Sequence, residues 1–270
     1  LVEVCPTGVF TNKPFSHHYT RKWDLQSAAS VCSHCSIGCN LSIGERYGSV
    51  RRVVNRYHPT LNGYFLCDRG RFGLGFVNTD KRIRTIQGVR TKVGEPSVGM
   101  VNEKSLTATL RGSIKEERFI GIGSARASIE GNRLLQYLVG RNNFSLGYNN
   151  VEMQLAVRHK QLLAQYPQES LAGIENRTSD KQQHDLVLII GENIEQSAPR
   201  LALSVRQVLK NAAFDKAEDI GVYPWQDAAV KTYAGEEKTA LINLQVQATE
   251  FDQEALLSLI LSPEKLLNAL

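Results

Sequence analysis

The sequence predicts an α/β protein in which a small module containing most of the cysteines precedes a doubly wound domain with a parallel sheet. Four of the five cysteines fall between residues 32 and 67. From residue 118 onward, short apolar segments alternate with segments of helical periodicity, which is typical of parallel strands covered by helices. The 270 residues, 42% of them hydrophobic, supply enough core for one large domain or two.

Residues 1–24 are expected to be a connector from a preceding part of the protein. They are rich in turn formers and aromatic residues. The sequence begins at Leu1 rather than at a methionine, and it enters at once a segment typical of a strand or loop. We therefore expect it to be a piece of a longer protein, truncated at both ends.

The module at residues 25–80 is defined by four cysteines with the spacing Cys32-x2-Cys35-x3-Cys39-x27-Cys67. Thiolates are soft ligands that suit iron–sulfur clusters or zinc. One tight loop can cover three iron corners of a cubane [4Fe–4S] cluster, and the fourth corner must be met by another segment. Structural zinc sites usually pair two short Cys-x2–4-Cys knuckles instead. The spacing therefore favours one [4Fe–4S] cluster held by all four cysteines over zinc or four incidental buried thiols.

Glycines and arginines surround these cysteines. Gly38 directly precedes Cys39, and glycine lets backbone N–H groups approach cluster sulfurs without a Cβ in the way. Nearby arginines could raise the reduction potential of an anionic cluster or could form a solvated basic strand edge, and the sequence leaves both interpretations open. The arginines concerned are Arg46, Arg51, Arg52, Arg56, Arg69 and Arg71. His34 could sit near the cluster, but four cysteines already complete the ligand set.

Cys5 is the fifth cysteine, and Pro6 follows it directly. A Cys-Pro pair closes bacterial ferredoxin-type ligand runs, in which the last cysteine binds a different cluster from its immediate neighbours. Cys5 is therefore either a ligand of a second [4Fe–4S] cluster, whose other ligands would precede Leu1, or a buried free thiol.

Elements of both kinds follow in order along the chain. Ser49–Asn55 has the alternating, β-branched pattern of a strand, and short possible strands separated by glycines follow within residues 81–115. Further strands are predicted at residues 118–122, 185–190, 219–223 and 241–245. Helices are predicted at residues 127–139, 151–166, 201–210, 226–233 and 251–261, with a last helix opening at Pro263. Ser197 is the predicted N-cap of the third of these helices, with Pro199 in its first turn.

Several classes of function are disfavoured. A net charge of +5 without a lysine-rich run or a stacking aromatic pattern argues against nucleic acid as a partner. The longest aliphatic run, Leu186–Ile190, is too short to span a bilayer, so no direct membrane insertion is expected. The Gly121-x-Gly123 turn lacks the third glycine of the dinucleotide-binding fingerprint and is better explained as a tight strand–helix turn. The cysteine pattern indicates a reducing compartment rather than a disulfide scaffold.

The cysteine spacing, followed by Gly-Arg-Phe-Gly at residues 70–73 and then an α/β domain, resembles the molybdopterin oxidoreductases. Within that superfamily the chain most closely resembles the large G subunits of bacterial respiratory complex I, the NADH:quinone oxidoreductase. The segments that carry this resemblance are residues 4–8, 21–24, 35–40, 44–48, 65–73 and 123–128.

The resemblance implies roles for all five cysteines. Cys32, Cys35, Cys39 and Cys67 would hold an additional cluster that lies off the main electron path and is usually taken as structural or vestigial. Cys5 would be the last ligand of a cluster in the main chain from NADH to quinone. The remaining ligands of that cluster would belong to a missing ferredoxin-like N-terminal part.

The resemblance also implies a setting. Residues 81–270 would form a molybdopterin-oxidoreductase-like α/β domain without pterin. The partners would be other peripheral-arm subunits of complex I, at the cytoplasmic face of the bacterial inner membrane. The chain would be part of an NADH:quinone oxidoreductase, and the fragment alone is not expected to be catalytic.

A catalytic molybdopterin oxidoreductase, such as a formate dehydrogenase, is the alternative. Such enzymes typically carry lysine two residues after the fourth cysteine, where this chain has Arg69. They also supply a cysteine, selenocysteine or serine to the metal, roughly where this chain has residues 150–152, and no cysteine follows Cys67. No molybdopterin is therefore expected.

Overall fold

The structure is a computed structural model of the 270-residue chain. It describes residues 2, 5, 7, 9–11, 13–82, 87–92, 95–100, 102–115, 119–166, 171–175 and 184–269. The chain divides into two compact units. One unit comprises Leu1–Asn78 together with Glu169–Leu270, and the other comprises Thr79–Gln168.

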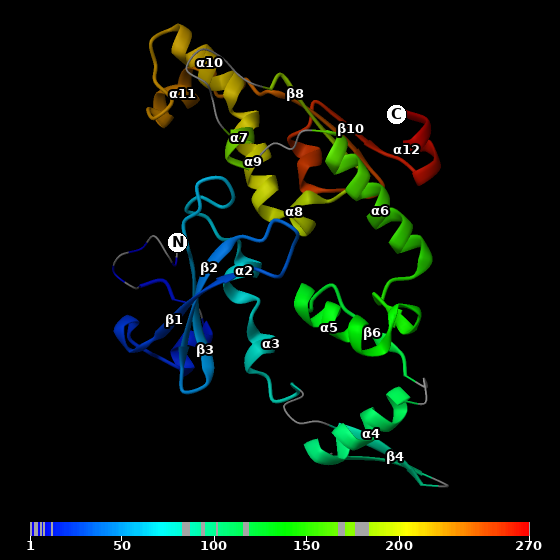
Figure 1. Cartoon of the computed structure of the whole chain (residues 1–270). Helices are drawn as coiled ribbons and strands as arrows, with labels where there is room; N and C mark the ends of the chain where they lie inside the picture. Colours follow the sequence, from blue (N-terminus) through cyan, green and yellow to red (C-terminus); the bar gives the residue numbers. More distant parts are fainter. Residues whose placement is uncertain are drawn as a thin grey trace. The chain divides into compact units, whose positions relative to one another are not determined.

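A three-stranded antiparallel sheet carries the cysteine module (Figure 1). Its strands lie in the order β1-β2-β3 and comprise Gln26–Val31 (β1), Asn40–Arg46 (β2) and Ser49–Asn55 (β3). Tyr47 and Gly48 join β2 to β3 with φ angles of 55° and 74°. Two positive φ angles in a two-residue loop match the right-handed twist of the strands on either side. The predicted strand at Ser49–Asn55 is confirmed.

Short helices flank this sheet. They are α1 (Lys13–His17), η1 (Lys22–Asp24), α2 (Asp68–Phe72) and α3 (Gly75–Asn78). Leu41 of β2 and Val53 of β3 form a buried cluster with the side chains of Cys32 and Cys39. The core of the module therefore includes two of the four cysteines.

A parallel sheet forms the later part of the same unit. Its three strands lie in the order β10-β9-β8 and comprise Leu186–Ile190 (β8), Ala240–Gln245 (β9) and Leu257–Ile260 (β10). The helices of this part are α7 (Leu171–Glu175), α8 (Ile194–Ser197), α9 (Pro199–Leu209), α10 (Asn211–Asp219), α11 (Asp227–Ala234), η3 (Glu250–Gln253) and α12 (Pro263–Ala269). Ile189, Val205, Leu241 and Phe251 join strands and helices in one buried cluster.

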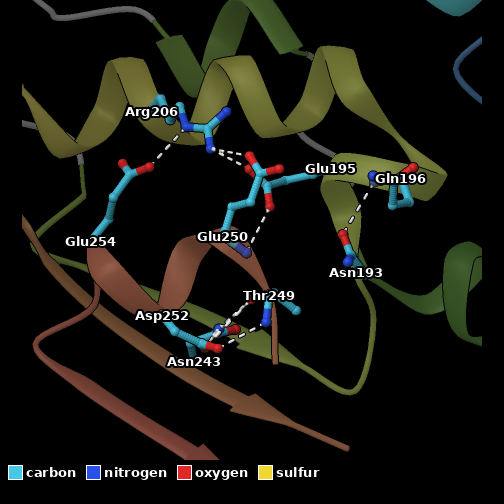
Figure 2. A network of polar contacts seen from close by, with 9 residues as sticks. All are labelled: Asn193, Glu195, Gln196, Arg206, Asn243, Thr249, Glu250, Asp252 and Glu254. Carbon is cyan, nitrogen blue, oxygen red and sulfur yellow. Dashed lines mark hydrogen bonds and ion pairs between the residues drawn. The ribbon is translucent and has the colours of Figure 1, made fainter. Parts of the chain in front are cut away.

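Polar contacts tie α9 to α8 and η3 (Figure 2). Arg206 of α9 pairs with Glu195 of α8, and its Nε lies 2.9 Å from a carboxylate oxygen of Glu254. The guanidinium carbon of Arg206 lies 4.8 Å from the ring centre of Phe251. Burial lowers the pKa of Arg206, but the hydrogen bonds and charges of Glu254 and Glu195 outweigh burial and raise it. Arg206 therefore stays charged and connects α9 to α8 and to the end of η3.

A second set of contacts in Figure 2 closes the loop after β9. Asn243, which is fully buried, donates from Nδ2 to Thr249 Oγ1 at 2.9 Å and to Asp252 Oδ1 at 2.7 Å. Thr249 and Asp252 also cap η3, because the backbone N–H of Thr249 donates to Asp252. The loop is thus held by side chains rather than by sheet pairing.

The second unit contains a hairpin, a parallel pair of short strands and three α-helices within its described residues. The strands are β4 (Gln87–Lys92), β5 (Glu95–Met100), β6 (Gly121–Ile122) and β7 (Phe144–Ser145). The helices are α4 (Glu103–Lys115), α5 (Ile129–Val139), η2 (Arg141–Asn143) and α6 (Asn150–Gln165). The pair β4–β5 is antiparallel, and the pair β6–β7 is parallel.

Many of the predicted elements are confirmed. The helices predicted at residues 127–139, 151–166, 201–210 and 226–233 correspond to α5, α6, α9 and α11, and the last helix begins at Pro263. The strands predicted at residues 185–190 and 241–245 correspond to β8 and β9. The strand predicted at 118–122 is present only as Gly121–Ile122, and residue 118 lies outside the described residues. The parallel pairing expected of an α/β fold is present in both units.

Three predictions are wrong. Of the short strands expected within residues 81–115, β4 and β5 are present, but Glu103–Lys115 forms the helix α4. The strand predicted at residues 219–223 is the end of α10 and the turn after it, because Ala213 and Ala217 face α11 and are buried against Val230 and Ala234. The helix predicted at residues 251–261 is the short η3 followed by the strand β10. Pairing of β10 with β9 satisfies backbone groups that a helix would otherwise satisfy internally.

Ser197 is not the N-cap of α9. It is the last residue of α8, and the N-cap position is taken by Ala198, whose side chain makes no capping hydrogen bond. Pro199 stands at the first helical position as predicted, where its missing N–H costs nothing. Among the described residues, none of the helices is long and apolar enough to cross a bilayer.

Candidate metal centre

The loop between β1 and β2 carries three of the predicted ligands. Cys32 follows the last residue of β1, and Cys39 precedes the first residue of β2. The backbone N–H of Cys32 donates to the carbonyl oxygen of Cys39 at 2.9 Å, which extends the antiparallel ladder to the base of the loop. Gly38, with a φ angle of +65°, turns the chain just before Cys39. Cys35 therefore lies within a short loop whose ends are pinned together.

The fourth ligand, Cys67, stands at the N-cap of α2. Its Sγ accepts a hydrogen bond from the backbone N–H of Gly70 at 3.4 Å. Gly70 is buried, and a Cβ added there would lie 3.4 Å from Cys32 Sγ and 2.7 Å from the end of the Leu66 side chain. The backbone of Gly70 thus approaches the sulfurs of both Cys67 and Cys32. The structure brings the loop cysteines and the distant Cys67 to one place.

Burial and mutual charge affect these thiols. Cys32 and Cys39 are 7% and 4% exposed, whereas Cys35 and Cys67 are half-buried. Burial raises the pKa of Cys39 to about 11, and the neighbouring Cys35, Cys32 and Cys67 contribute to the same rise. Burial likewise raises the pKa of Cys32, with added contributions from Cys67 and Cys35. A thiolate at Cys39 is thus disfavoured in the protein alone, so metal binding there must displace protons.

The donor set fits an iron–sulfur cluster. Four thiols from two segments lie near enough to affect one another's charge, and a backbone N–H is directed at one sulfur. A cubane offers each thiolate a different iron, and hydrogen bonds to the sulfurs tune its potential. Among the described residues, no three His, Cys, Asp or Glu side chains are grouped so as to hold a single metal ion.

Asn62 connects the segment before Cys67 to the loop cysteines, and the sequence did not reveal it. The residue is fully buried. Its Oδ1 accepts from the backbone N–H of Asn40, the residue after Cys39, at 3.0 Å. Its Nδ2 lies within hydrogen-bonding distance of oxygen atoms of Asn40, Asn55, Arg56 and Phe65. The only signal for it was the Asn-Gly pair at residues 62–63, which is typical of a turn and says nothing of burial.

Arg200 of α9 is the second residue that sequence reasoning missed. It is 5% exposed, and its Nε donates to the carbonyl oxygen of Asn62 at 3.4 Å. Its guanidinium carbon lies 5.4 Å from the ring centre of Phe65, two residues before Cys67. Its positive charge lowers the pKa of Cys39, against the larger effect of burial. Nothing in the local sequence marks this arginine, because its neighbours come from the cysteine module.

The arginines that the sequence singled out behave differently from one another. Arg69 lowers the pKa of Cys32 through its charge, although burial and other thiols raise that pKa overall. Arg71 donates to the carbonyl oxygen of Val53 at 3.3 Å, so it binds the sheet. Arg46 lies over the ring of Tyr47 at the hairpin turn, at 4.7 Å. Of these three, Arg69 is the one with a charge effect on a predicted ligand.

His34 and Cys5 complete the predicted residues. The His34 ring contacts Phe76 edge-on, with ring centres 6.2 Å apart, and its Nε2 is buried without a hydrogen-bond partner among the described residues. Cys5 Sγ lies 3.0 Å from Thr7 Oγ1, and hydrogen bonds from the side chain and backbone of Thr7 lower the pKa of Cys5. Pro6 lies outside the described residues.

One family of known proteins matches the segment that contains the four clustered cysteines. Residues 25–79 match the molybdopterin oxidoreductase Fe4S4 domain, and this segment includes Cys32, Cys35, Cys39 and Cys67 but not Cys5.

Full-length relatives extend the likeness beyond the cysteine module. The chain is 42% identical over 254 residues to the G subunit of the NADH-quinone oxidoreductase of Shewanella oneidensis, which covers 93% of the chain and 27% of that protein. It is 43% identical over 258 residues to the Escherichia coli K12 protein of the same name, covering 94% of the chain and 27% of that protein. The corresponding protein of Pseudomonas fluorescens is 42% identical over 255 residues, with the same shares of 94% and 27%. The chain therefore spans about a quarter of the length of these curated relatives.

Proposed function

We propose that this chain, a homologue of the G subunits of NADH-quinone oxidoreductases, binds one [4Fe–4S] cluster through Cys32, Cys35, Cys39 and Cys67 and contributes to electron transfer in such a complex. The observation that carries the proposal is the convergence of the β1–β2 loop and the N-cap of α2 within the segment that matches an Fe4S4 domain. A bound cluster would supply a one-electron carrier.

The residues of the chain would hold and shield such a cluster. The four thiolates would bind its irons, and the N–H of Gly70 would donate to a ligand sulfur. Apolar side chains pack around Cys32 and Cys39 and would limit water at the site. They are Leu41, Val53, Ile37, Ile43, Val50, Leu66 and Leu74. Burial and hydrogen bonds of this kind are the means by which a protein sets the potential of a cluster.

Cys5 would belong to a second [4Fe–4S] cluster whose other ligands lie in a part of the protein outside this sequence. In the arrangement we propose, residues 1–24 connect to that part, residues 25–80 form the cluster module and residues 81–270 form the α/β domain. Other peripheral-arm subunits of the complex would be the partners, at the cytoplasmic face of the membrane. The chain alone would carry no catalytic site.

The α/β domain is proposed to work without a pterin cofactor. The segment at residues 150–152, where a catalytic relative would place a metal ligand, is the first turn of α6. Its one carboxylate, that of Glu152, accepts from the N–H of Asn149 at 3.0 Å, and Asn149 Oδ1 accepts from the N–H of Glu152 at 2.9 Å. This reciprocal capping explains both side chains without a metal.

Metal and sulfide analysis of the anaerobically purified protein tests the proposal. We expect iron and acid-labile sulfide at about four each per chain, without molybdenum. Molybdenum together with an extractable pterin would support the catalytic alternative. About one zinc per chain, with little iron, would support a structural zinc module instead.

A further inference from the structure

We propose that Arg200 is a positioning residue for the cluster, whose buried positive charge favours cluster reduction and whose contacts fix the segment that delivers Cys67. The inference rests on the proposed function, because it assigns a role toward the same cluster. It concerns a residue that lies outside the segment matching the Fe4S4 domain.

The geometry places Arg200 at the contact between α9 and the cysteine module. Its Nε donates to the carbonyl oxygen of Asn62, and its guanidinium lies over the ring of Phe65. Asn62 in turn binds the backbone N–H of Asn40, next to Cys39. Phe65 stands two residues before Cys67. The Arg200 side chain therefore contacts residues close to both Cys39 and Cys67.

Arg200 is held in this position by its other contacts. Its Nη1 and Nη2 pair with the carboxylate of Glu175 at the end of α7, the second at 3.1 Å. Its Nη1 also donates to Ser204 Oγ, one turn further along α9, at 2.9 Å. Burial raises the pKa of Glu175, but the hydrogen bonds of Arg200 and Ser204 and the charge of Arg200 lower it overall, so the carboxylate stays charged.

The charge of Arg200 is largely shielded from solvent. The side chain is 5% exposed, so solvent screens it weakly. Its hydrogen bond to the carbonyl oxygen of Asn62 and its position over the ring of Phe65 place this charge beside the segments that carry Cys39 and Cys67. Because one-electron reduction adds a negative charge to the cluster, a nearby buried cation stabilises the reduced form more than the oxidised form. Arg200 therefore raises the reduction potential.

A role in packing alone makes a different prediction from a role in charge. Removing either partner of a buried ion pair is destabilising, so loss of stability alone cannot distinguish the two roles. The sign of the change in reduction potential distinguishes the two roles. Arg200→Gln removes the cation, whereas Glu175→Gln removes the anion that partly offsets it. The two substitutions should shift the potential in opposite directions.

An EPR-monitored redox titration of the anaerobically purified protein tests this. We expect a lower midpoint potential in Arg200→Gln, a higher one in Glu175→Gln, and a value close to that of the wild type in Arg200→Lys. The matched control is Arg206→Gln, because Arg206 lies on the same helix and is also ion-paired, but its partners are Glu195 and Glu254 rather than residues of the cysteine module. Arg206→Gln should lower thermal stability and leave the potential unchanged.

The results of these titrations separate a failure of the role proposed for Arg200 from a failure of the cluster assignment. If Arg200→Gln fails to fold, the double variant Arg200→Gln/Glu175→Gln removes the pair without leaving an unpaired buried charge and should still show a lower potential. Equal potentials in the wild type and both single variants, or shifts of the same sign in both, would overturn the role of Arg200 while leaving the cluster assignment intact. A wild-type protein without iron and sulfide would instead overturn the proposed function itself.

Discussion

Cys35 is the proposed ligand whose loss should be simplest to interpret, because it is half-buried and lies in the loop rather than in the core of the module. We predict that Cys35→Ala removes most of the iron and lowers the melting temperature. The loop is held at its base by the backbone hydrogen bond from Cys32 to Cys39, so bound metal would supply much of its folding energy. Iron content and thermal denaturation measure both effects.

The matched control for Cys35→Ala is Cys5→Ala. Cys5 lies outside the segment that matches the Fe4S4 domain, and its thiol contacts Thr7 rather than the other cysteines. Iron content in Cys5→Ala should equal that of the wild type. Full iron content and unchanged stability in Cys35→Ala would mean that the ligand assignment is incorrect.

Asn62 should be the most sensitive residue of the site that is not a ligand. Asn62→Ala would leave buried backbone groups near Asn40 and Phe65 unsatisfied, at a cost of about 1–3 kcal/mol for each group. We therefore expect a markedly lower free energy of unfolding and faster loss of iron to a chelator.

Asn78→Ala is the control for Asn62→Ala. Asn78 also bridges a backbone, donating to the carbonyl oxygen of Val50 at 2.8 Å and accepting from its N–H at 2.9 Å, but these hydrogen bonds lie near solvent. Water can replace them, so the change should be small. Equal effects of the two substitutions would show that Asn62 has no special place in the cluster site.

The short helix η3 is held by the carboxylate of Asp252. Hydrogen bonds from Ser258, then from the backbone of Thr249 and from Asn243, lower the pKa of Asp252 below its ordinary value of 3.8. A carboxylate with a lowered pKa stabilises the fold above the pKa of the unfolded state, and this contribution is lost as the pH falls through the folded-state pKa.

We therefore predict that Asp252→Asn melts at a lower temperature than the wild type at pH 7, and that the difference shrinks as the pH falls below about 4. Thermal denaturation followed by circular dichroism across this range measures it. A difference in melting temperature that stays constant from about pH 7 to about pH 3 would show that the charge of Asp252 does not stabilise the fold.

The elements that the sequence predicted are those with strong local patterns. Helix α6 has a capping box at Asn149 and Glu152, and β8 is a continuous aliphatic run. The elements that it missed depend on partners elsewhere in the chain. The strand β10 forms because β9 offers a parallel edge, and α10 continues because Ala213 and Ala217 fit against α11. The local sequence of β10 and α10 does not show that β9 and α11 will pack beside them.

The same distinction holds for the cluster site. The four proposed ligands could be chosen from the sequence, because their spacing suits the shape of a cubane, and their assignment stays a prediction. Asn62 and Arg200 were not, because their roles depend on burial and on contacts between segments that are distant in sequence. The approach of Cys67 to the β1–β2 loop could be expected from the chemistry of a cluster that needs four ligands. The contacts of Asn62 and Arg200 that support this arrangement could be seen only in the folded structure.

At the scale of the whole assembly, Cys5 gives the sharpest prediction. In a complete NADH-quinone oxidoreductase that contains this chain, Cys5→Ser should block electron transfer from NADH to quinone, since a missing carrier lengthens the tunnelling distance. NADH:quinone activity of the purified, assembled complex measures it, with Cys35→Ala as the comparison that touches only the other cluster. An assembled Cys5→Ser complex with normal activity would reject the proposed second cluster.

The Mössbauer spectrum of the anaerobically purified chain, enriched in ⁵⁷Fe, tests the central claim most directly. Four thiolates on one cubane should give a single diamagnetic [4Fe–4S]²⁺ species that accounts for about four irons per chain. The signal should disappear when Cys67 is replaced by alanine, because the fourth corner then loses its ligand. A spectrum of mononuclear tetrathiolate iron, or a protein that contains zinc and no iron, would contradict the cluster assignment.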